Sequence, residues 1–203
     1  MPLAGKTKRE VVTEFRHAEI LDAARHVFAR RGFSQASMEE ISHAAGVAKG
    51  TLYLYYRSKQ ELYRAALHAG LLDLCARLEH CIDAAPTLEG RIRAFVATKV
   101  GYFESHRDFF RIYSAELGLA ATGMCDKALR DLCRRQVRLL QAALHTDAPA
   151  KTEDPRADEA AANAIFDLTR GVIMRRLAGW ANTPLEDDVD FVVNFANRAL
   201  AGR

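Results

Sequence analysis

The sequence lacks any long, uncharged apolar segment. No such run approaches the ~18 residues that a membrane-spanning helix requires, although 49% of the 203 residues are hydrophobic and 27% are charged. The first ten residues are polar and basic, and no apolar stretch of the kind found in signal peptides follows them. We therefore expect a soluble, cytoplasmic protein that is long enough for one large or two modest domains.

Cysteine is scarce, and its spacing fits no metal site. The four cysteines form no CxxC pair, and none lies at zinc-finger spacing from a histidine. We interpret them as reduced thiols packed in a helical interior rather than as metal ligands or disulfides. A redox-sensing role stays open for Cys125 and Cys133, because their spacing would place them on one helical face.

The motifs on which many enzymes rely are also missing. The segment GVAKGT at 46–51 lacks the residue order of a Walker A loop and the strand before it, and no GxGxxG, GxSxG or HExxH occurs. The acidic residues clustered at 186–190 resemble a metal site at first sight. We interpret them as first-turn residues that stabilise the dipole of the last helix. We therefore expect no enzymatic activity, no cofactor and no metal.

Charge is spread unevenly along the chain. Residues 1–64 hold eleven Lys and Arg against seven Asp and Glu, whereas the remainder holds eighteen against nineteen. A basic N-terminal part on a nearly neutral remainder suggests contact with a polyanion. Many charge excesses are only solvated faces, so this signal needs support from a motif.

Apolar spacing and helix caps predict helices along the whole chain. The first covers residues 15–31 and stops at Gly32. Ser37 opens a capping box with the glutamate three residues on, and the short helix that follows ends at Gly46. A second capping box, which starts at Ser58, opens a long helix. Further helices are expected at 87–105, 106–119, 122–145, 156–181 and 186–201, with an exposed loop at 146–155.

One segment between these helices has the pattern of a strand. Residues 51–56, TLYLYY, alternate polar and apolar side chains and favour β structure. A lone strand would find no partner in a helical chain, so we predict a short helix that buries Leu52 and Tyr56. With the turn at Gly46 it completes a helix-turn-helix, whose second helix would lie in the DNA major groove. Lys59 opens the next helix, where a cation is slightly unfavourable unless a phosphate binds. In total we predict nine helices and no strand.

The segments ILDAARHVFARRGF and SMEEISHAAGVAKGTLYLYYRSKQEL resemble the DNA-binding domain of the TetR family of transcriptional regulators. The resemblance covers residues 19–67, and the rest of the chain is similar only in helix count and in a final helical pair of the kind that dimerises in that family. It implies an all-α fold. Residues 1–60 would form a three-helix DNA-binding domain, with 1–13 as a flexible basic arm. Residues 61–203 would form a helical ligand-binding and dimerisation domain.

By position, the resemblance assigns DNA contacts to seven residues. For Tyr55, packing in the core is the alternative to a DNA contact. For Tyr56 we expect packing in the core. For Ser37, helix capping and a phosphate contact can coexist. The residues expected to approach bases are Lys49, Gly50 and Tyr53, and those expected to contact phosphates are Ser37, Thr51, Tyr55 and Lys59.

The helices after residue 88 interleave aromatic side chains with polar ones. Apolar walls with a few polar groups are typical of a ligand site. An ordinary helical core with satisfied polar residues is the alternative. The candidate effector-binding residues are Lys99, Tyr102, Phe103, Phe110, Tyr113, Glu116, Gln136, Phe166 and Arg170.

The last two helices are the candidate dimer interface. Gly171 and Gly179 would let two backbones approach closely, and an isologous four-helix contact would bury the apolar face of the final helix. The stripe expected to form that face consists of Val189, Val192, Phe195, Ala196 and Ala199.

Taken together, these patterns predict a ligand-responsive transcriptional repressor. It would bind an inverted-repeat operator in double-stranded DNA as a homodimer, and a small amphipathic or aromatic effector would release it. The alternative is a constitutive or architectural DNA-binding protein without a small-molecule ligand. We expect no membrane partner.

Overall fold

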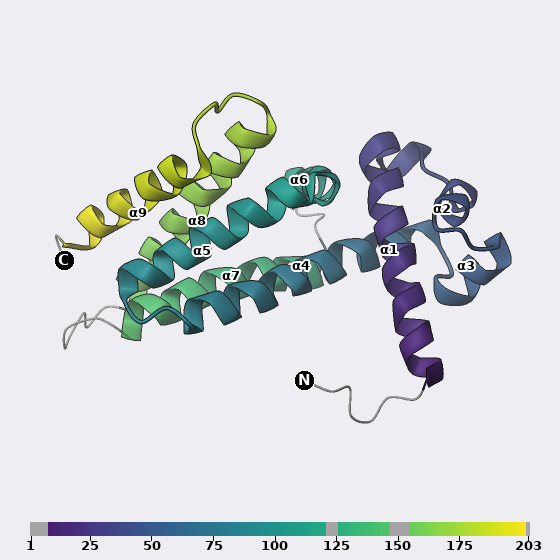
Figure 1. Cartoon of the computed structure of the whole chain (residues 1–203), viewed down its shortest axis with the longest axis horizontal. Helices are drawn as coiled ribbons and strands as arrows, with labels where there is room; N and C mark the ends of the chain where they lie inside the picture. Colours follow the sequence, from purple (N-terminus) through teal and green to yellow (C-terminus); the bar gives the residue numbers. More distant parts are fainter. Residues whose placement is uncertain (1–7, 121–125, 147–154, 202–203) are drawn as a thin grey trace. The chain divides into compact units, whose positions relative to one another are not determined.

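The computed structural model describes residues 8–120, 126–146 and 155–201. Within these ranges the chain forms nine helices and no strand (Figure 1), which confirms the predicted all-α class. The predicted loop at 146–155 lies almost entirely outside the described residues. The helices are α1 (Lys8–Gln35), α2 (Met38–Ala44), α3 (Lys49–Tyr55), α4 (Lys59–Asp83), α5 (Leu88–Ser105), α6 (Arg107–Ala120), α7 (Lys127–Thr146), α8 (Pro155–Leu177) and α9 (Leu185–Ala201).

The helices group into two compact units that do not follow the order of the chain. The first unit comprises Met1–Gly70 and Asp108–Cys125, and the second comprises Leu71–Arg107 and Asp126–Arg203. Helix α4 begins in the first unit and ends in the second, while α6 belongs to the first unit with α1, α2 and α3. The functional boundary expected between residues 60 and 61 stays a prediction.

Helix α1 is longer than its apolar spacing indicated. It begins at Lys8, so the second half of the expected arm at 1–13 is helical, and residues 1–7 lie outside the described part. Gly32 interrupts the helix at φ 73°, ψ 164°, as its position predicted. The next residue, Phe33, packs back on Phe28 with ring centroids 6.1 Å apart.

The helix-turn-helix lies where the capping residues in the sequence predicted it. The Ser37 hydroxyl accepts a hydrogen bond from the Glu40 amide at 3.1 Å and starts α2. Gly46 then takes a left-handed conformation at φ 64°, which an L side chain adopts with strain. Helix α3 follows as a helix despite its strand-like sequence, because Leu52 is completely buried on its inner face. Burial therefore outweighs local propensity here.

Two side-chain hydrogen bonds fix the start of α4. The Glu61 amide donates to the Ser58 hydroxyl at 3.1 Å. The Glu61 carboxylate reaches back and accepts from the Arg57 amide at 2.8 Å, one residue before the expected partner. The capping box predicted at 58–61 is thus present with a shifted return bond.

Helix α6 packs inside the first unit through two specific contacts with α4. A Cβ atom added to Gly70 would lie 2.5 Å from the ring of Phe109, so α4 and α6 approach each other at a site that only glycine fits. The Tyr63 hydroxyl donates to the Ile112 carbonyl at 3.3 Å. Burial, and after it the charge of Glu116, raises the pKa of Tyr63 to about 12.

In the second unit, α5 lies at the centre and packs against α7, α8 and α9, while α8 also packs against α7 and α9 (Figure 1). The Thr87 hydroxyl caps α5 by accepting from the Gly90 amide, as predicted. Cys75 and Glu79 on the second half of α4 contact α7, the thiol at the Leu132 carbonyl and the carboxylate at Arg135. None of the described helices is both long and apolar enough to cross a membrane.

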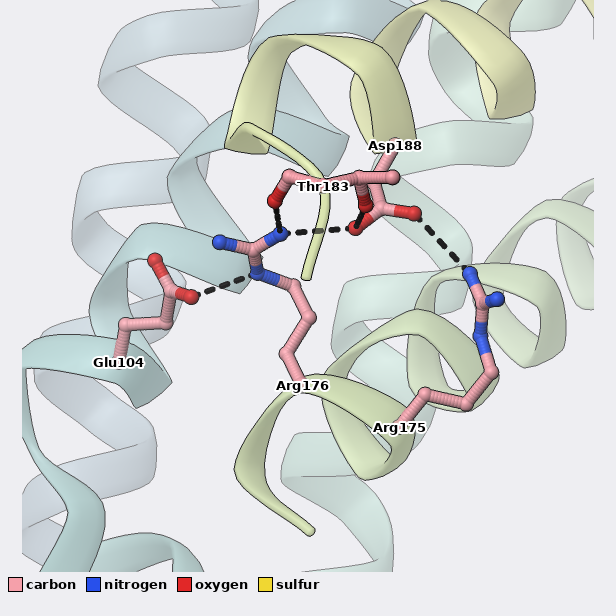
Figure 2. A network of polar contacts seen from close by, with 5 residues as sticks. All are labelled: Glu104, Arg175, Arg176, Thr183 and Asp188. Atoms are coloured by element: carbon pink, nitrogen blue, oxygen red, sulfur yellow. Dashed lines mark hydrogen bonds and ion pairs between the residues drawn. The ribbon is translucent and has the colours of Figure 1, made fainter. Parts of the chain in front are cut away.

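A buried ion-pair network holds the connection between α8 and α9 (Figure 2). The Asp188 carboxylate accepts from Arg175 at 3.0 Å and from Arg176 at 2.8 Å. Arg176 also donates to the Glu104 carboxylate on α5 at 2.6 Å, so one guanidinium joins three helices. Asp188 does lie in the first turn of α9, as expected, but its side chain is 8% exposed and serves as an internal partner.

The apolar stripe predicted on α9 is wrong in part. Val189, Val192 and Ala196 are buried within their own chain, because this face of α9 packs against α5 and α8. The large apolar side chains that α9 exposes are Phe191 and Phe195. Gly179 takes φ 74° directly after α8, so its role in the structure is to end that helix.

Candidate nucleic-acid interface and buried polar site

Helix α3 presents a defined outer face. Leu52 anchors it to the first unit, while Tyr53 is 43% exposed and Leu54 is 85% exposed. Thr51 and Tyr55 are half-buried at the edges of this face. The side chains expected to contact DNA are therefore on the outside of the short helix, and the predicted inner residue is on the inside.

Gly50 has no internal reason to be glycine. A Cβ atom built on it would meet nothing within 4 Å, and its φ is not in the left-handed range. Glycine inside a helix costs about 1 kcal/mol relative to alanine, so a close approach by a partner outside the chain is the kind of constraint that explains it. Beside it, the exposed Lys49 ammonium pairs with Glu39 on α2 at 3.1 Å.

A histidine on α1 supports the end of α3. The rings of His17 and Tyr55 meet edge to face with centroids 4.6 Å apart. The other ring neighbour, Tyr56, is buried and forms a 3.1 Å hydrogen bond between its hydroxyl and His17 Nδ1. Burial, followed by the charge of Glu61, raises the pKa of Tyr56. Tyr56 is thus a packing residue, as predicted, and Tyr55 packs on one side only.

Lys59 has a structural role that the sequence did not reveal. Its ammonium donates to the Ser34 carbonyl at 3.1 Å and to the Ala36 carbonyl at 2.9 Å, and it lies 4.8 Å from the ring centroid of Phe33. The expectation that a lysine at this position has no structural role is therefore wrong, and its contact with a phosphate stays a prediction. Lys59 satisfies carbonyl groups that the end of α1 leaves free.

The nine candidate effector residues divide between the two units. Phe110, Tyr113 and the half-buried Glu116 belong to the first unit. Arg170 is exposed and pairs with Asp167 at 3.0 Å, so it does not lie in the interior where it was expected. The five that are buried in the second unit are Lys99, Tyr102, Phe103, Gln136 and Phe166.

Lys99 and Gln136 are polar side chains in the interior of the second unit. The Lys99 ammonium lies 3.2 Å from the ring centroid of Phe166 and 5.4 Å from that of Phe95. It has no hydrogen-bond acceptor among the described residues, and neither atom of the Gln136 amide has a partner there. Burial is the largest cause that lowers the pKa of Lys99 to about 7, and the charge of Cys133 acts in the opposite direction.

Two cysteines that the sequence reading treated as packing residues stand close to this amine. Cys133 and Cys75 both act electrostatically on Lys99. Burial raises the pKa of the Cys75 thiol to about 11, which keeps it protonated and unreactive at neutral pH. Cys125, the other half of the suggested redox pair, lies outside the described residues. No group of three His, Cys, Asp or Glu in the described ranges is placed to hold a metal ion.

An apolar groove of about 260 Å³ runs between α8 and α9. Alanine, isoleucine and leucine side chains line the groove together with Phe195. The Phe195 side chain is 51% exposed, and its ring stacks on that of Phe191. Three residues of the stripe that the sequence predicted on α9, Phe195, Ala196 and Ala199, line this groove, whereas Val189 and Val192 are buried within the chain. The residues that line the groove are Ala160, Ala161, Ala164, Ile165, Leu168, Phe195, Ala196, Ala199 and Leu200.

Comparisons with known proteins agree with this geometry. Residues 20–66 match the family described as bacterial regulatory proteins, tetR family. The chain is 32% identical over 130 residues to the transcriptional activator FasR of Mycolicibacterium smegmatis, covering 59% of each chain. It is 28% identical over half of each chain to the transcriptional repressor KstR2 of Rhodococcus jostii. The chain thus matches about three fifths or less of the length of these curated relatives.

The likeness extends further among solved structures. A TetR-like transcriptional regulator from Rhodococcus sp. RHA1 aligns with a TM-score of 0.74 and 26% identity, covering 93% of this chain and 97% of that one. The shared architecture therefore includes α4 to α9 and not the helix-turn-helix alone. The matched domain identifies residues 20–66 as a DNA-binding domain of the tetR family of bacterial regulatory proteins, and the TetR-like regulator from Rhodococcus shares the fold of nearly the whole chain.

Proposed function

We propose that this chain is a cytoplasmic, ligand-responsive repressor that binds an inverted-repeat operator as a homodimer and is released by a small amphipathic or aromatic effector. The observation that carries the proposal is α3. It is a helix of seven residues, held at Leu52, with Gly50 open and Tyr53 facing outward. A helix of this kind fits the major groove, where base edges can be distinguished.

The outer face of α3 supports the division of DNA contacts. Lys49, Gly50 and Tyr53 are exposed, which supports an approach to bases. Thr51 and Tyr55 are half-buried at the edges of this face, which supports contacts with phosphates. Ser37 can contact a phosphate while it caps α2. Lys59 is less suited to a free phosphate contact, because two carbonyl groups already hold its ammonium.

The test of DNA binding uses substitutions that leave the fold intact. Tyr53→Phe and Thr51→Ala should each weaken operator binding by about 1–3 kcal/mol, because each removes a hydroxyl contact. Gel-shift titrations at two salt concentrations measure the loss. Tyr63→Phe is the matched control, since it removes a tyrosine hydroxyl that faces α6 rather than DNA. Unchanged operator affinity in both α3 variants would refute the assignment.

The surface of α8 and α9 supports a homodimer. Phe191 and Phe195 expose stacked rings beside a groove lined by small apolar residues, and an aromatic ring from a second copy fits such a groove. Two helix-turn-helix units in a symmetric dimer would read half-sites one helical turn apart, about 34 Å. A single short helix would cover too few base pairs for selectivity.

The interior of the second unit supports an effector. Aromatic walls with a few unpaired polar groups are the usual composition of a small-molecule site. A thermal-shift screen of amphipathic and aromatic compounds, followed by gel shifts with each hit, tests this part. If a confirmed ligand leaves DNA affinity unchanged at every concentration, we would conclude that this chain binds DNA constitutively. Repression itself is tested by a reporter gene behind the operator, whose transcription should rise when the effector is added.

A further inference from the structure

The unpaired amine of Lys99 is the feature of the second unit that its fold does not explain. Its side chain is almost completely buried on α5, and the nearest partners are the faces of two phenylalanine rings. An aromatic face attracts a cation but accepts no conventional hydrogen bond from it. Buried polar groups in proteins are nearly always hydrogen-bonded, so an amine without an acceptor calls for a functional explanation.

Gln136, on the neighbouring helix α7, is a second buried polar side chain without a partner among the described residues. It is fully buried, and both its amide nitrogen and its carbonyl oxygen lack a partner in the described part of the chain. It lies one turn after Cys133, which is close enough to Lys99 to act on its charge. Helices α5 and α7 pack against each other, so the two polar groups belong to the same interior.

The charges around Lys99 do not supply the anion that it lacks. The ionisable groups that act on it are the two thiols Cys75 on α4 and Cys133 on α7, and the pair of Asp167 and Arg170 on α8. Asp167 and Arg170 neutralise each other at 3.0 Å on the surface. The burial of Cys75 favours its neutral form. When Lys99 is protonated, these groups therefore offer its ammonium no unpaired carboxylate as a counter-ion.

We propose that the effector of this chain is an amphipathic carboxylic acid whose carboxylate lies between Lys99 and Gln136 and whose apolar part packs on Phe95 and Phe166. This inference rests on the proposed function. A carboxylate carries one negative charge, matches one ammonium and has acceptor capacity left for the Gln136 amide. A phosphate would bring up to two charges to a site with one cation. On binding, the carboxylate replaces the Phe166 ring as the partner of the amine.

The proposal predicts a specific pH dependence. The free protein holds Lys99 at a pKa of about 7, and a bound carboxylate raises that pKa. Below pH 7 the amine is already protonated in the free protein, so the affinity for the carboxylate does not change with pH. Above pH 7 the amine must take up a proton on binding, and the affinity falls by up to about tenfold per pH unit until the pKa of the complex is reached. A neutral ligand of the same length should show no such fall.

Isothermal titration calorimetry on the full chain tests this with decanoic acid and decan-1-ol. At pH 6.5 the acid should bind at least about tenfold more tightly than the alcohol, because only the acid forms charge-assisted hydrogen bonds. Between pH 6.5 and pH 8.5 the affinity for the acid should fall and that for the alcohol should stay constant. Titrations in two buffers of different ionisation enthalpy should show uptake of close to one proton at pH 8.5.

Variants separate the amine from the apolar interior. Lys99→Met should lower affinity for decanoic acid by about tenfold or more and change affinity for decan-1-ol little. Lys127→Met, at an exposed lysine on α7, should behave as the wild type. Gln136→Leu provides a second variant if the first does not fold, and it should lower affinity for the acid several-fold, since one hydrogen bond is lost.

Three results would overturn the inference: no binding of decanoic acid by the wild type, equal binding of acid and alcohol, or full affinity for the acid in Lys99→Met. These outcomes are distinct from failure of the proposed function. If another compound from the screen releases operator DNA while the acid does not bind, the regulator stands and only its effector class is wrong. If the acid binds as expected but operator DNA stays bound, the site stands and induction fails.

Discussion

At the scale of single residues, Asp188 shows why a charged side chain is found inside this protein. Its carboxylate accepts from two guanidinium groups and from the Thr183 hydroxyl, so its lone pairs are used (Figure 2). The hydrogen bond to Asp188 raises the pKa of Arg176, which stays charged. A buried pair of this kind adds little over an apolar replacement, but removal of one partner leaves an uncompensated charge.

We therefore expect Asp188→Asn to destabilise the second unit by about 3 kcal/mol, because Arg175 and Arg176 would lose their shared counter-ion. Urea denaturation followed by circular dichroism measures the change. Asp190→Asn is the matched control on the same helix, since Asp190 forms an exposed ion pair with Arg93 and should contribute less than about 1 kcal/mol. Equal effects of the two substitutions would contradict the central role of Asp188.

The contacts that individual side chains make were harder to predict from the sequence than the positions of the helices. Caps such as Ser37 and Ser58 were readable because their partners lie three residues away. The structural role of Lys59 was missed because its partners are the carbonyls of residues 34 and 36, which only the folded chain brings near. Asp188 was interpreted as a first-turn residue that only stabilises the helix dipole, because its partners Arg175 and Arg176 lie on the preceding helix, 13 and 12 residues away. Local chemistry is visible in a sequence, whereas tertiary pairing is not.

At the scale of helices, the contact between α4 and α6 depends on one missing side chain. The ring of Phe109 occupies the space that a Cβ atom at Gly70 would need. Apolar periodicity placed both helices correctly, yet it did not indicate that α6 joins the first unit. Such periodicity shows which face of a helix is buried but not which helix covers it.

Gly70→Ala should therefore destabilise the first unit by about 1–3 kcal/mol, since the new methyl group would overlap the Phe109 ring. Thermal unfolding measures the loss. Gly101→Ala is the control, because Gly101 lies inside α5 with nothing within 4 Å of its Cβ position, and alanine should stabilise that helix by up to about 1 kcal/mol. The double variant Gly70→Ala with Phe109→Leu should recover part of the loss. A harmless Gly70→Ala would disprove the tight contact.

At the scale of the whole molecule, the proposed homodimer would form through the two exposed aromatic side chains on α9. Phe191 is 61% exposed and Phe195 is 51% exposed, which is unusual for rings beside an apolar groove unless a partner covers them. Phe195→Glu should weaken the homodimer at least about tenfold, because it would bury a charge without a counter-ion. Analytical ultracentrifugation across a concentration series measures this. Leu54→Glu, at an exposed apolar residue on α3, should leave the assembly state unchanged.

The proposed regulation would require that the two units communicate, and α4 is a helix with residues in both units. It is one continuous helix whose residues up to Gly70 belong to the first unit and whose residues from Leu71 belong to the second. Cys75, on the second half of α4, already acts on the charge of Lys99. A ligand that changes the surroundings of Lys99 therefore acts on a helix that continues into the unit carrying α3.

Coupling of this kind is reciprocal, which gives a test that does not depend on the structural route. If the compound found by the screen lowers operator affinity by some factor, saturating operator DNA must lower the affinity for that compound by the same factor, typically about 5–150-fold. Calorimetric titration with and without operator measures both numbers. The Lys99→Met variant should reduce the two effects together, because it removes one interaction from a single thermodynamic cycle. A compound that binds the wild type while operator affinity stays unchanged would contradict the proposed coupling.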